Sequence, residues 1–159
     1  MTENVFINMD RQTTPSEAFL LFHIERGKEV VLRVKGSSMG LTLAPSRDVL
    51  VRPLRRSPFF GEVVLLYNGS NFIVHRVVGW VPGKRGLIIT KGDNCRHSDP
   101  PVRRSEIVGL VIGIQGPEGL CVPWRWRFPL SYLIALVSLT EAIYWRARAK
   151  WNRYKRKKS

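Results

Sequence analysis

The segment EVVLLYNGSNFIVHRVV, residues 62–78, is the part of the sequence that decides the fold prediction. Two runs rich in β-branched and aromatic residues, 62–67 and 72–78, flank Asn68-Gly69-Ser70-Asn71. Asn-Gly between two such runs is a strong signal for a tight hairpin turn. The segment therefore predicts two antiparallel strands.

Four more short apolar runs lie outward from this hairpin, at residues 30–34, 49–51, 87–89 and 107–114. Pro53 follows the second run and indicates an edge strand or a strand terminus. Six short strands separated by Gly- and Pro-rich turns favour a mainly β fold. We expect an antiparallel coiled sheet or a barrel-like core.

A short helix is predicted before the strands. Thr14-Pro15-Ser16-Glu17 combines an N-cap, a proline at the first helical position and an acid that closes a capping box. Gly27 is the expected stop. We divide the chain into an N-terminal segment (residues 1–29), a central β domain (30–116) and a C-terminal part (117–159).

The charge is concentrated in the C-terminal part. The chain has 159 residues and a net charge of +14. Residues 124–159 contain ten basic residues and one acid, Glu141. A cationic block of this kind favours an anionic partner, either lipid or nucleic acid.

An apolar stretch at residues 128–145 is about the minimum length that spans a bilayer, and it has aromatic residues at both ends. We expect a membrane-associated helix, spanning or in-plane, with anionic lipid bound through residues 124–159. Two alternatives remain: a soluble core helix with a basic end, and a non-specific nucleic-acid-binding tail. No sequence-specific nucleic acid is expected.

The termini and cysteines narrow the class further. Met1 is followed by Thr-Glu-Asn, so no signal peptide is expected. Cys95 and Cys121 are interpreted as ordinary thiols, in preference to a single disulfide. The sequence has no CxxC zinc pattern, and we expect neither a metal nor a cofactor.

Three places could carry chemistry. Ser38 follows a predicted strand among small residues, where its hydroxyl can be exposed. The string around it matches the G-x-S-x-G elbow, but no helix-forming segment follows, so that match is interpreted as accidental. His75 lies in the second hairpin strand and has the side chain best suited to act as a general base. Asp93 and Asp99 are acids that could orient it.

Together these pieces form an ordered set: Ser38-Met39 after a strand, residues 48–51, Gly61-Glu62-Val63-Val64, His75-Arg76-Val77-Val78, Thr90-Lys91-Gly92-Asp93-Asn94, Asp99, and Ile107-Val108-Gly109. The set resembles the type I signal peptidase family, within the group that also holds self-cleaving repressor peptidases. The resemblance covers roughly residues 30–114.

The resemblance implies roles for individual residues. His75, in a His-Arg-Val setting, matches the archaeal, endoplasmic-reticulum and sporulation-type branch, which has His where other members have Lys. Ser38 would be the nucleophile, His75 the general base, Asp99 the acid that orients it and Asp93 a second important acid. The oxyanion and substrate loop would contain Gly36, Ser37 and Met39, with the Ser38 N–H as donor. A Ser38/Lys91 dyad is the alternative.

The implied function is a serine endopeptidase that cleaves a peptide or precursor protein after small residues, through an acyl-enzyme. Residues 30–34 would offer an edge to the extended substrate. Departures from the family pattern are Leu41 and Pro45-Ser46-Arg47-Asp48 in the loop after Met39, and the expected lack of an N-terminal membrane segment. A spanning helix would place the basic tail in the cytoplasm, by the positive-inside rule, and the catalytic domain on the other side of the membrane. Since no N-terminal signal that would export the catalytic domain is expected, a helix that lies in the membrane plane is preferred.

Two alternatives to the peptidase stay open. One is a catalytically silent membrane- or protein-binding module of the same fold. The other, less favoured, is a repressor-type regulator. Such a regulator needs a helical DNA-binding domain, and residues 1–29 predict only one short helix.

Overall fold

The computed structural model describes residues 5–7, 14–40, 42–43, 47–115 and 121–123, and helical residues at 132–137, 139–141, 143–144, 147–148 and 151. The described part is mainly β, with a short N-terminal helix and a C-terminal helix. The mainly β prediction is therefore confirmed.

One sheet contains all the strands that the structure describes. In chain order they are β1 (Val5–Ile7), β2 (Val30–Val34), β3 (Arg47–Pro53), β4 (Val63–Tyr67), β5 (Phe72–Trp80), β6 (Leu87–Lys91), β7 (Val102–Arg103), β8 (Ile107–Gln115) and β9 (Cys121–Pro123). A 3₁₀ turn, Arg104–Glu106, separates β7 from β8.

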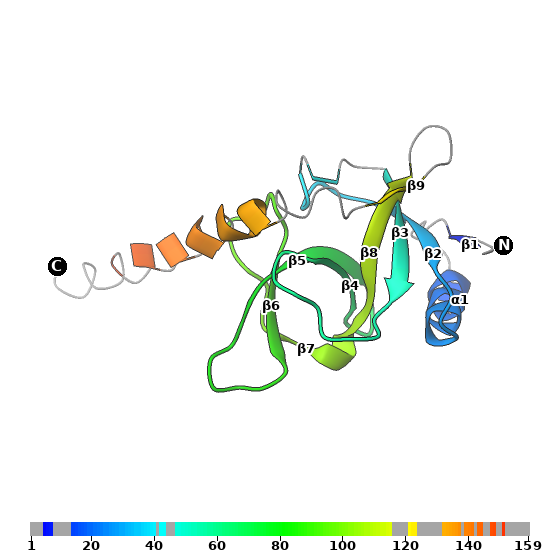
Figure 1. Ribbon diagram of the computed structural model, residues 1–159, viewed down its shortest axis with the longest axis horizontal. Helices are drawn as coiled ribbons and strands as arrows, with labels where there is room; N and C mark the ends of the chain where they lie inside the picture. Colours follow the sequence, from blue (N-terminus) through cyan, green and yellow to red (C-terminus); the bar gives the residue numbers. More distant parts are fainter. Residues whose placement is uncertain are drawn as a thin grey trace.

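The strand order is β1-β2-β3-β8-β4-β5-β6-β7, and β9 pairs with β8. All neighbours are antiparallel except β1 and β2, which run parallel. The sheet curls into a half-barrel (Figure 1), and residues of β2 and β5 line one pocket. This curl brings residues far apart in the sequence to one site.

The predicted hairpin forms as expected. β4 and β5 pair from Val63↔Arg76 to Tyr67↔Phe72. The Asn68 carboxamide oxygen accepts hydrogen bonds from the backbone N–H groups of Ser70 and Asn71, at 3.1 and 2.8 Å, which closes the turn. Pro53 is a strand terminus rather than an edge, because β3 lies between β2 and β8.

Helix α1 (Thr14–Glu25) begins at the expected threonine. Gly27 follows in a left-handed conformation with φ of 80°. The N–H of Gly27 donates to the Ile24 carbonyl, and that of Lys28 donates to the His23 carbonyl. These bonds satisfy carbonyls at the helix end, so the predicted stop is confirmed.

The interior consists of two apolar clusters. The larger cluster packs α1 against β2, β3 and β4, and it includes Leu20, Leu32, Met39 and Val51. The smaller one lies on the other side of the curl, around Val64, Val77 and Ile107. Met39, next to Ser38, is fully part of the larger cluster, so the core fixes one end of the Ser38 loop.

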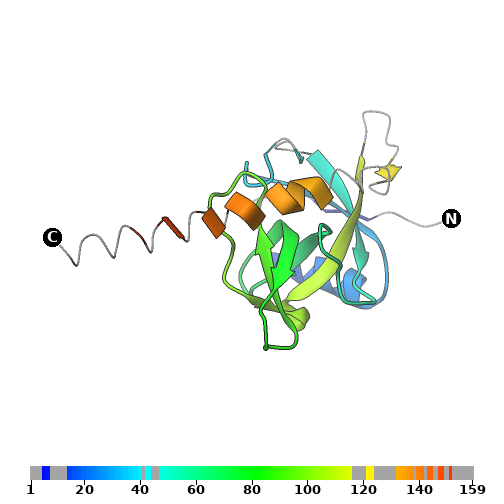
Figure 2. The same cartoon turned by 60° about the vertical axis from the view of Figure 1, so that its left-hand side comes forward.

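The C-terminal helix lies across the β5–β6 end of the sheet (Figure 2). Ala135 is buried, and the Tyr132 ring contacts Phe60 with centroids 5.5 Å apart. None of the helices in the described residues has the length and apolar character needed to cross a membrane. Within the predicted apolar stretch at 128–145, residues 128–131, 138, 142 and 145 lie outside the described residues.

Candidate active site

His75 and Asp99 form a short polar contact at the site. His75 is buried on β5, and its Nδ1 lies 2.6 Å from Asp99 Oδ2. The Thr90 hydroxyl donates to the same Asp99 oxygen at 2.7 Å, and the Asp99 N–H donates to the Thr90 carbonyl at 2.8 Å. A His that donates Nδ1–H to a carboxylate keeps Nε2 free to accept a proton. The pair is therefore arranged as a general base.

Gly92 brings the Ser38 residue and the imidazole together. A Cβ on Gly92 would lie 2.7 Å from the Ser38 carbonyl oxygen, 2.8 Å from Cys95 Sγ and 2.9 Å from His75 Nε2. Three groups thus converge on the space that only a glycine leaves empty. Nε2, the ring nitrogen that does not contact Asp99, is the one that lies near the Ser38 carbonyl across this space.

The Ser38 loop is held by backbone and side-chain bonds. The Ser37 carbonyl accepts the Gly40 N–H at 3.0 Å and the Asn94 side-chain amide at 3.2 Å. The Asn94 N–H donates to the Ser38 carbonyl at 2.7 Å. Gly36 takes φ of 93°, which favours glycine at the turn out of β2. The loop after β6 therefore fixes the loop after β2.

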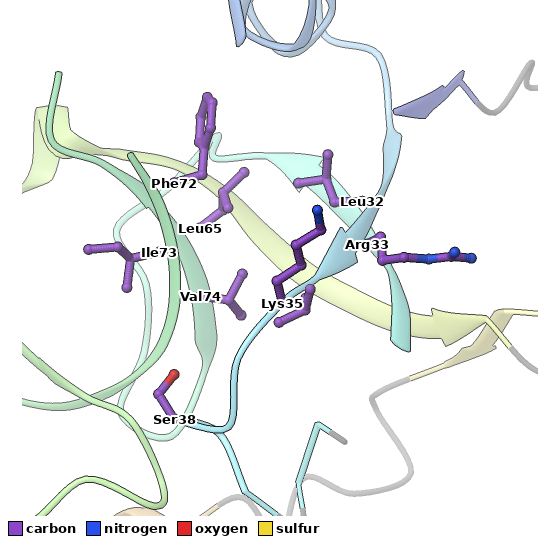
Figure 3. Close-up of a pocket in the computed structure, with 9 residues that line it drawn as sticks. Leu32, Arg33, Lys35, Ser38, Leu65, Phe72, Ile73 and Val74 are labelled. Carbon is purple, nitrogen blue, oxygen red and sulfur yellow. The ribbon is translucent and has the colours of Figure 1, made fainter. Parts of the chain in front are cut away.

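The Ser38 side chain borders a pocket of about 240 Å³. Figure 3 shows its hydroxyl pointing into the space between β2 and β5. The lining is largely apolar: Leu32, Val34, Leu65, Phe72, Ile73 and Val74, with Arg33 and Lys35. In the described part of the chain, no hydrogen bond joins the Ser38 hydroxyl to His75. Catalytic hydrogen bonds are often loose before substrate binds.

Two strand edges border this pocket. β1 pairs with β2 only at residues 30–32, and β6 pairs with β5 only from Arg76 onward. Among the strands that the structure describes, none pairs with Arg33 and Val34 on the β1 side or with Phe72 and Ile73 on the β6 side. The expected substrate edge is thus narrower than residues 30–34, because β1 covers its first three residues.

Asp93 lies in the same loop but serves a different partner. Its carboxylate accepts two hydrogen bonds from the fully buried Arg76 guanidinium, at 2.8 and 2.7 Å. Arg76 also donates to the Gly61 carbonyl at 2.8 Å. The structure therefore places Asp93 on Arg76 and not on His75. The geometry gives it a structural role, anchoring the loop to β5.

Lys91 does not face Ser38. Its side chain is fully buried, and its Nζ lies 3.3 Å from Glu141 Oε2 on the C-terminal helix. This arrangement offers a Ser38/Lys91 dyad no support, because the ammonium is directed to a carboxylate on another element.

Asp48, at the start of the second motif, pairs with Arg33 at 2.8 and 3.0 Å. The hydrogen bonds from Arg33 lower the pKa of Asp48 below its usual value, against the opposing effect of partial burial. The pair fixes the register of β2 on β3 beside the pocket. Of the residues where the sequence departs from the family pattern, Leu41, Pro45 and Ser46 lie outside the described residues, and Arg47 and Asp48 begin β3.

Sequence reasoning missed Thr90 and Asn94 as parts of the site. Both belong to the quoted Thr90-Lys91-Gly92-Asp93-Asn94 string, but only their neighbours received roles. The sequence signal that could have found Thr90 is its hydroxyl, which follows the predicted strand at residues 87–89 and begins the quoted string. Cys95 is a free thiol and borders the same space beside Gly92.

Comparisons with known proteins return no match, either to a protein-family model or to a curated protein.

Proposed function

We propose that this protein is a serine endopeptidase of the signal-peptidase type. The observation that carries the proposal is the His75 imidazole, which is held by Asp99 at 2.6 Å and has its other nitrogen beside the Ser38 backbone. A buried imidazole oriented by a carboxylate, next to a serine that borders a pocket, is the arrangement that activates a serine hydroxyl.

The reaction follows from these groups. Ser38 Oγ attacks the peptide carbonyl carbon while its proton passes to His75 Nε2. Asp99 stabilises the imidazolium that forms. The Ser38 N–H donates to the developing oxyanion. His75 then gives the proton to the leaving amine as the C–N bond breaks, which leaves an acyl-enzyme on Ser38. A water molecule, deprotonated by His75, completes hydrolysis.

The substrate is an extended peptide. Among the described strands, none pairs with the edge of β2 after Leu32 or with the edge of β5 before Arg76, and both edges border the pocket. Strand edges bind extended chains by backbone hydrogen bonds. The apolar lining favours an uncharged side chain beside the scissile bond. Cleavage after small residues is what the family resemblance adds.

The C-terminal part gives the enzyme its second partner, an anionic lipid surface. Leu133, Leu136 and Val137 are exposed on the same helix whose Ala135 is buried. Basic residues follow from Arg146 to Lys158. An exposed apolar face followed by a cationic segment favours in-plane binding to anionic lipid.

Cleavage of a panel of signal-peptide-like substrates tests the proposal. Ser38→Ala and His75→Ala should each lower kcat/KM by roughly 10³-fold or more, with the fold unchanged. Ser70→Ala in the exposed hairpin turn and His97→Ala on the surface are matched controls that should keep wild-type activity. Full activity of Ser38→Ala would remove the serine mechanism.

The silent-module alternative makes the opposite prediction. A protein of this fold that only binds a partner would leave every peptide of the panel uncut, and His75→Ala would affect stability alone. The observation that supports this alternative is that the Ser38 hydroxyl makes no hydrogen bond to His75 in the described structure.

A further inference from the structure

Two cations are buried side by side beneath the site. Arg76 on β5 and Lys91 on β6 are cross-strand partners, and both side chains are fully buried. Burying a charge is costly unless a partner of opposite charge is present. Each cation therefore needs its own carboxylate.

The two carboxylates come from different parts of the chain. Asp93 pairs with Arg76 from the loop directly after β6. Glu141 pairs with Lys91 from the C-terminal helix, with Nζ and Oε2 at 3.3 Å. Within the described residues, Glu141 is the only acid paired with the Lys91 ammonium. One of the two charges beneath the site is thus neutralised from outside the strand-and-loop core.

The helix that carries Glu141 also contacts the rest of the protein at residues other than Glu141. Ala135 is fully buried, and the Tyr132 ring packs on Phe60, two residues before Glu62. The orange helix lies over the β5–β6 end of the sheet in Figure 2. The ion pair is therefore part of a docked interface.

Lys91 is directly connected to the catalytic groups. It precedes Gly92, which lies against the Ser38 carbonyl and His75 Nε2. Two residues further on, the Asn94 N–H donates to the Ser38 carbonyl. A displacement of Lys91 would therefore move the loop that positions Ser38 against His75.

We propose that Glu141 is a positioning residue of the peptidase site, and that the site is complete only when the C-terminal helix is docked. This regulation rests on the proposed peptidase function. With the helix docked, Lys91 is neutralised and the loop at residues 92–95 holds Ser38. With the helix released, the Lys91 ammonium loses its partner and must move toward water, taking the loop with it. The helix that we propose to bind lipid thus also controls the site.

Glu141→Gln in the full-length chain tests this, with Glu25→Gln, an exposed acid of α1, as the matched control. Glu141→Gln should raise the hydrogen-exchange rate of the Asn94 amide about tenfold and lower kcat about tenfold, with KM within about twofold. Exchange of the Leu110 amide in β8 should stay at the wild-type rate. Lys91→Met combined with Glu141→Leu replaces the ion pair with apolar contact and should restore Asn94 protection.

Wild-type exchange at Asn94 in Glu141→Gln would overturn the proposal. Equal acceleration at Asn94 and Leu110 would also overturn it, because Glu141 would then support global stability only. If the wild-type protein cleaves no peptide, the peptidase function fails, and the exchange measurement still decides whether Glu141 positions the loop.

Discussion

At the scale of single residues, the Asp99 carboxylate is the group on which the proposed chemistry depends most. One of its oxygens accepts from both His75 Nδ1 and the Thr90 hydroxyl. Two donors on one oxygen hold the carboxylate in a single orientation, so the imidazole cannot rotate without losing its partner. Thr90 is fully buried, which keeps water from replacing it.

Thr90→Val tests this arrangement, since it keeps the side-chain shape and removes the hydroxyl. We expect kcat to fall about tenfold with KM nearly unchanged, because one hydrogen bond to a charged group contributes about 1.5–3 kcal/mol. A Thr90→Ser variant retains the hydroxyl and should keep most of the activity. If Thr90→Val turned over like the wild type, Thr90 would have no part in positioning Asp99.

Asp48 gives a prediction about acid stability. Its pKa is lowered by Arg33, so the ionised form is favoured in the folded state. A group with a lowered folded pKa stabilises the fold above its unfolded pKa, near pH 4, and this contribution is lost as the pH falls through the folded value. The effect is small, because Arg33 is about half exposed, at 48%.

Urea unfolding of Asp48→Asn measures this contribution. The variant should be less stable than the wild type at pH 7, and the two should converge as the pH falls through the lowered folded pKa of Asp48. High salt should shrink the difference at pH 7. A stability gap that is constant from pH 7 to pH 2 would mean that the ion pair is not its cause.

At the scale of elements, the site is made where the loop after β6 packs on the loop after β2. Gly92 is the contact point, and any side chain there would overlap the Ser38 backbone and His75. The Ser38 carbonyl belongs to the main chain and cannot move aside as a flexible side chain would.

Gly92→Ala should therefore separate Ser38 from His75. We expect a loss of about 1–3 kcal/mol in the free energy of unfolding, together with a fall in kcat/KM much larger than this destabilisation would explain. Thermal melting and peptide cleavage measure the two effects. Cys95→Ala removes one neighbour of the added methyl group, but the carbonyl contact remains, so the double variant should recover little activity. Wild-type cleavage by Gly92→Ala would contradict the packing at this junction.

The elements were largely predictable from the sequence, and their partners were not. β2 was predicted with its observed bounds, and the hairpin of β4 and β5 was identified from its Asn-Gly turn and apolar flanks. Three-residue strands such as β1 and β9 carry too little periodicity to be recognised. Their pairing depends on the curl of the whole sheet, which a local pattern does not encode.

The site was predictable to the extent that it follows chain order. The string from Thr90 to Asn94 indicated the right loop, and Asp99 was chosen as the partner of His75. The family resemblance separated Asp99 from Asp93. The residues alone could not, because the choice depends on which cation each acid meets across β5. Arg76 is directed inward and takes Asp93, which leaves Asp99 for the imidazole.

At the scale of the whole molecule, charge and exposed apolar surface are gathered at one end of the chain. Leu133 and Val137 are exposed at 58% and 51%, on the helix that precedes the cationic tail. We expect the full chain to bind vesicles that contain phosphatidylserine and to bind neutral vesicles weakly. The in-plane geometry predicts that binding falls steeply with ionic strength, as an electrostatic contribution requires.

Leu133→Glu with Val137→Glu should abolish sedimentation with anionic vesicles while leaving the β core folded. Ser105→Glu is the control, because it adds a negative charge on an exposed turn of the β core and should leave vesicle binding unchanged. Equal binding of the double variant and the wild type would remove the helix from the lipid contact. Binding that persists at high salt and after carbonate washing would favour a spanning segment.

The measurement that tests the central claim most directly is mass spectrometry of the intact protein after reaction with a serine-directed fluorophosphonate or a slow peptide ester. Nucleophilic catalysis predicts one covalent adduct per chain, located on Ser38 by peptide mapping. It also predicts no adduct in Ser38→Ala and much slower formation in His75→Ala. An adduct on another residue, or equal labelling of wild type and His75→Ala, would contradict the Ser38/His75 mechanism.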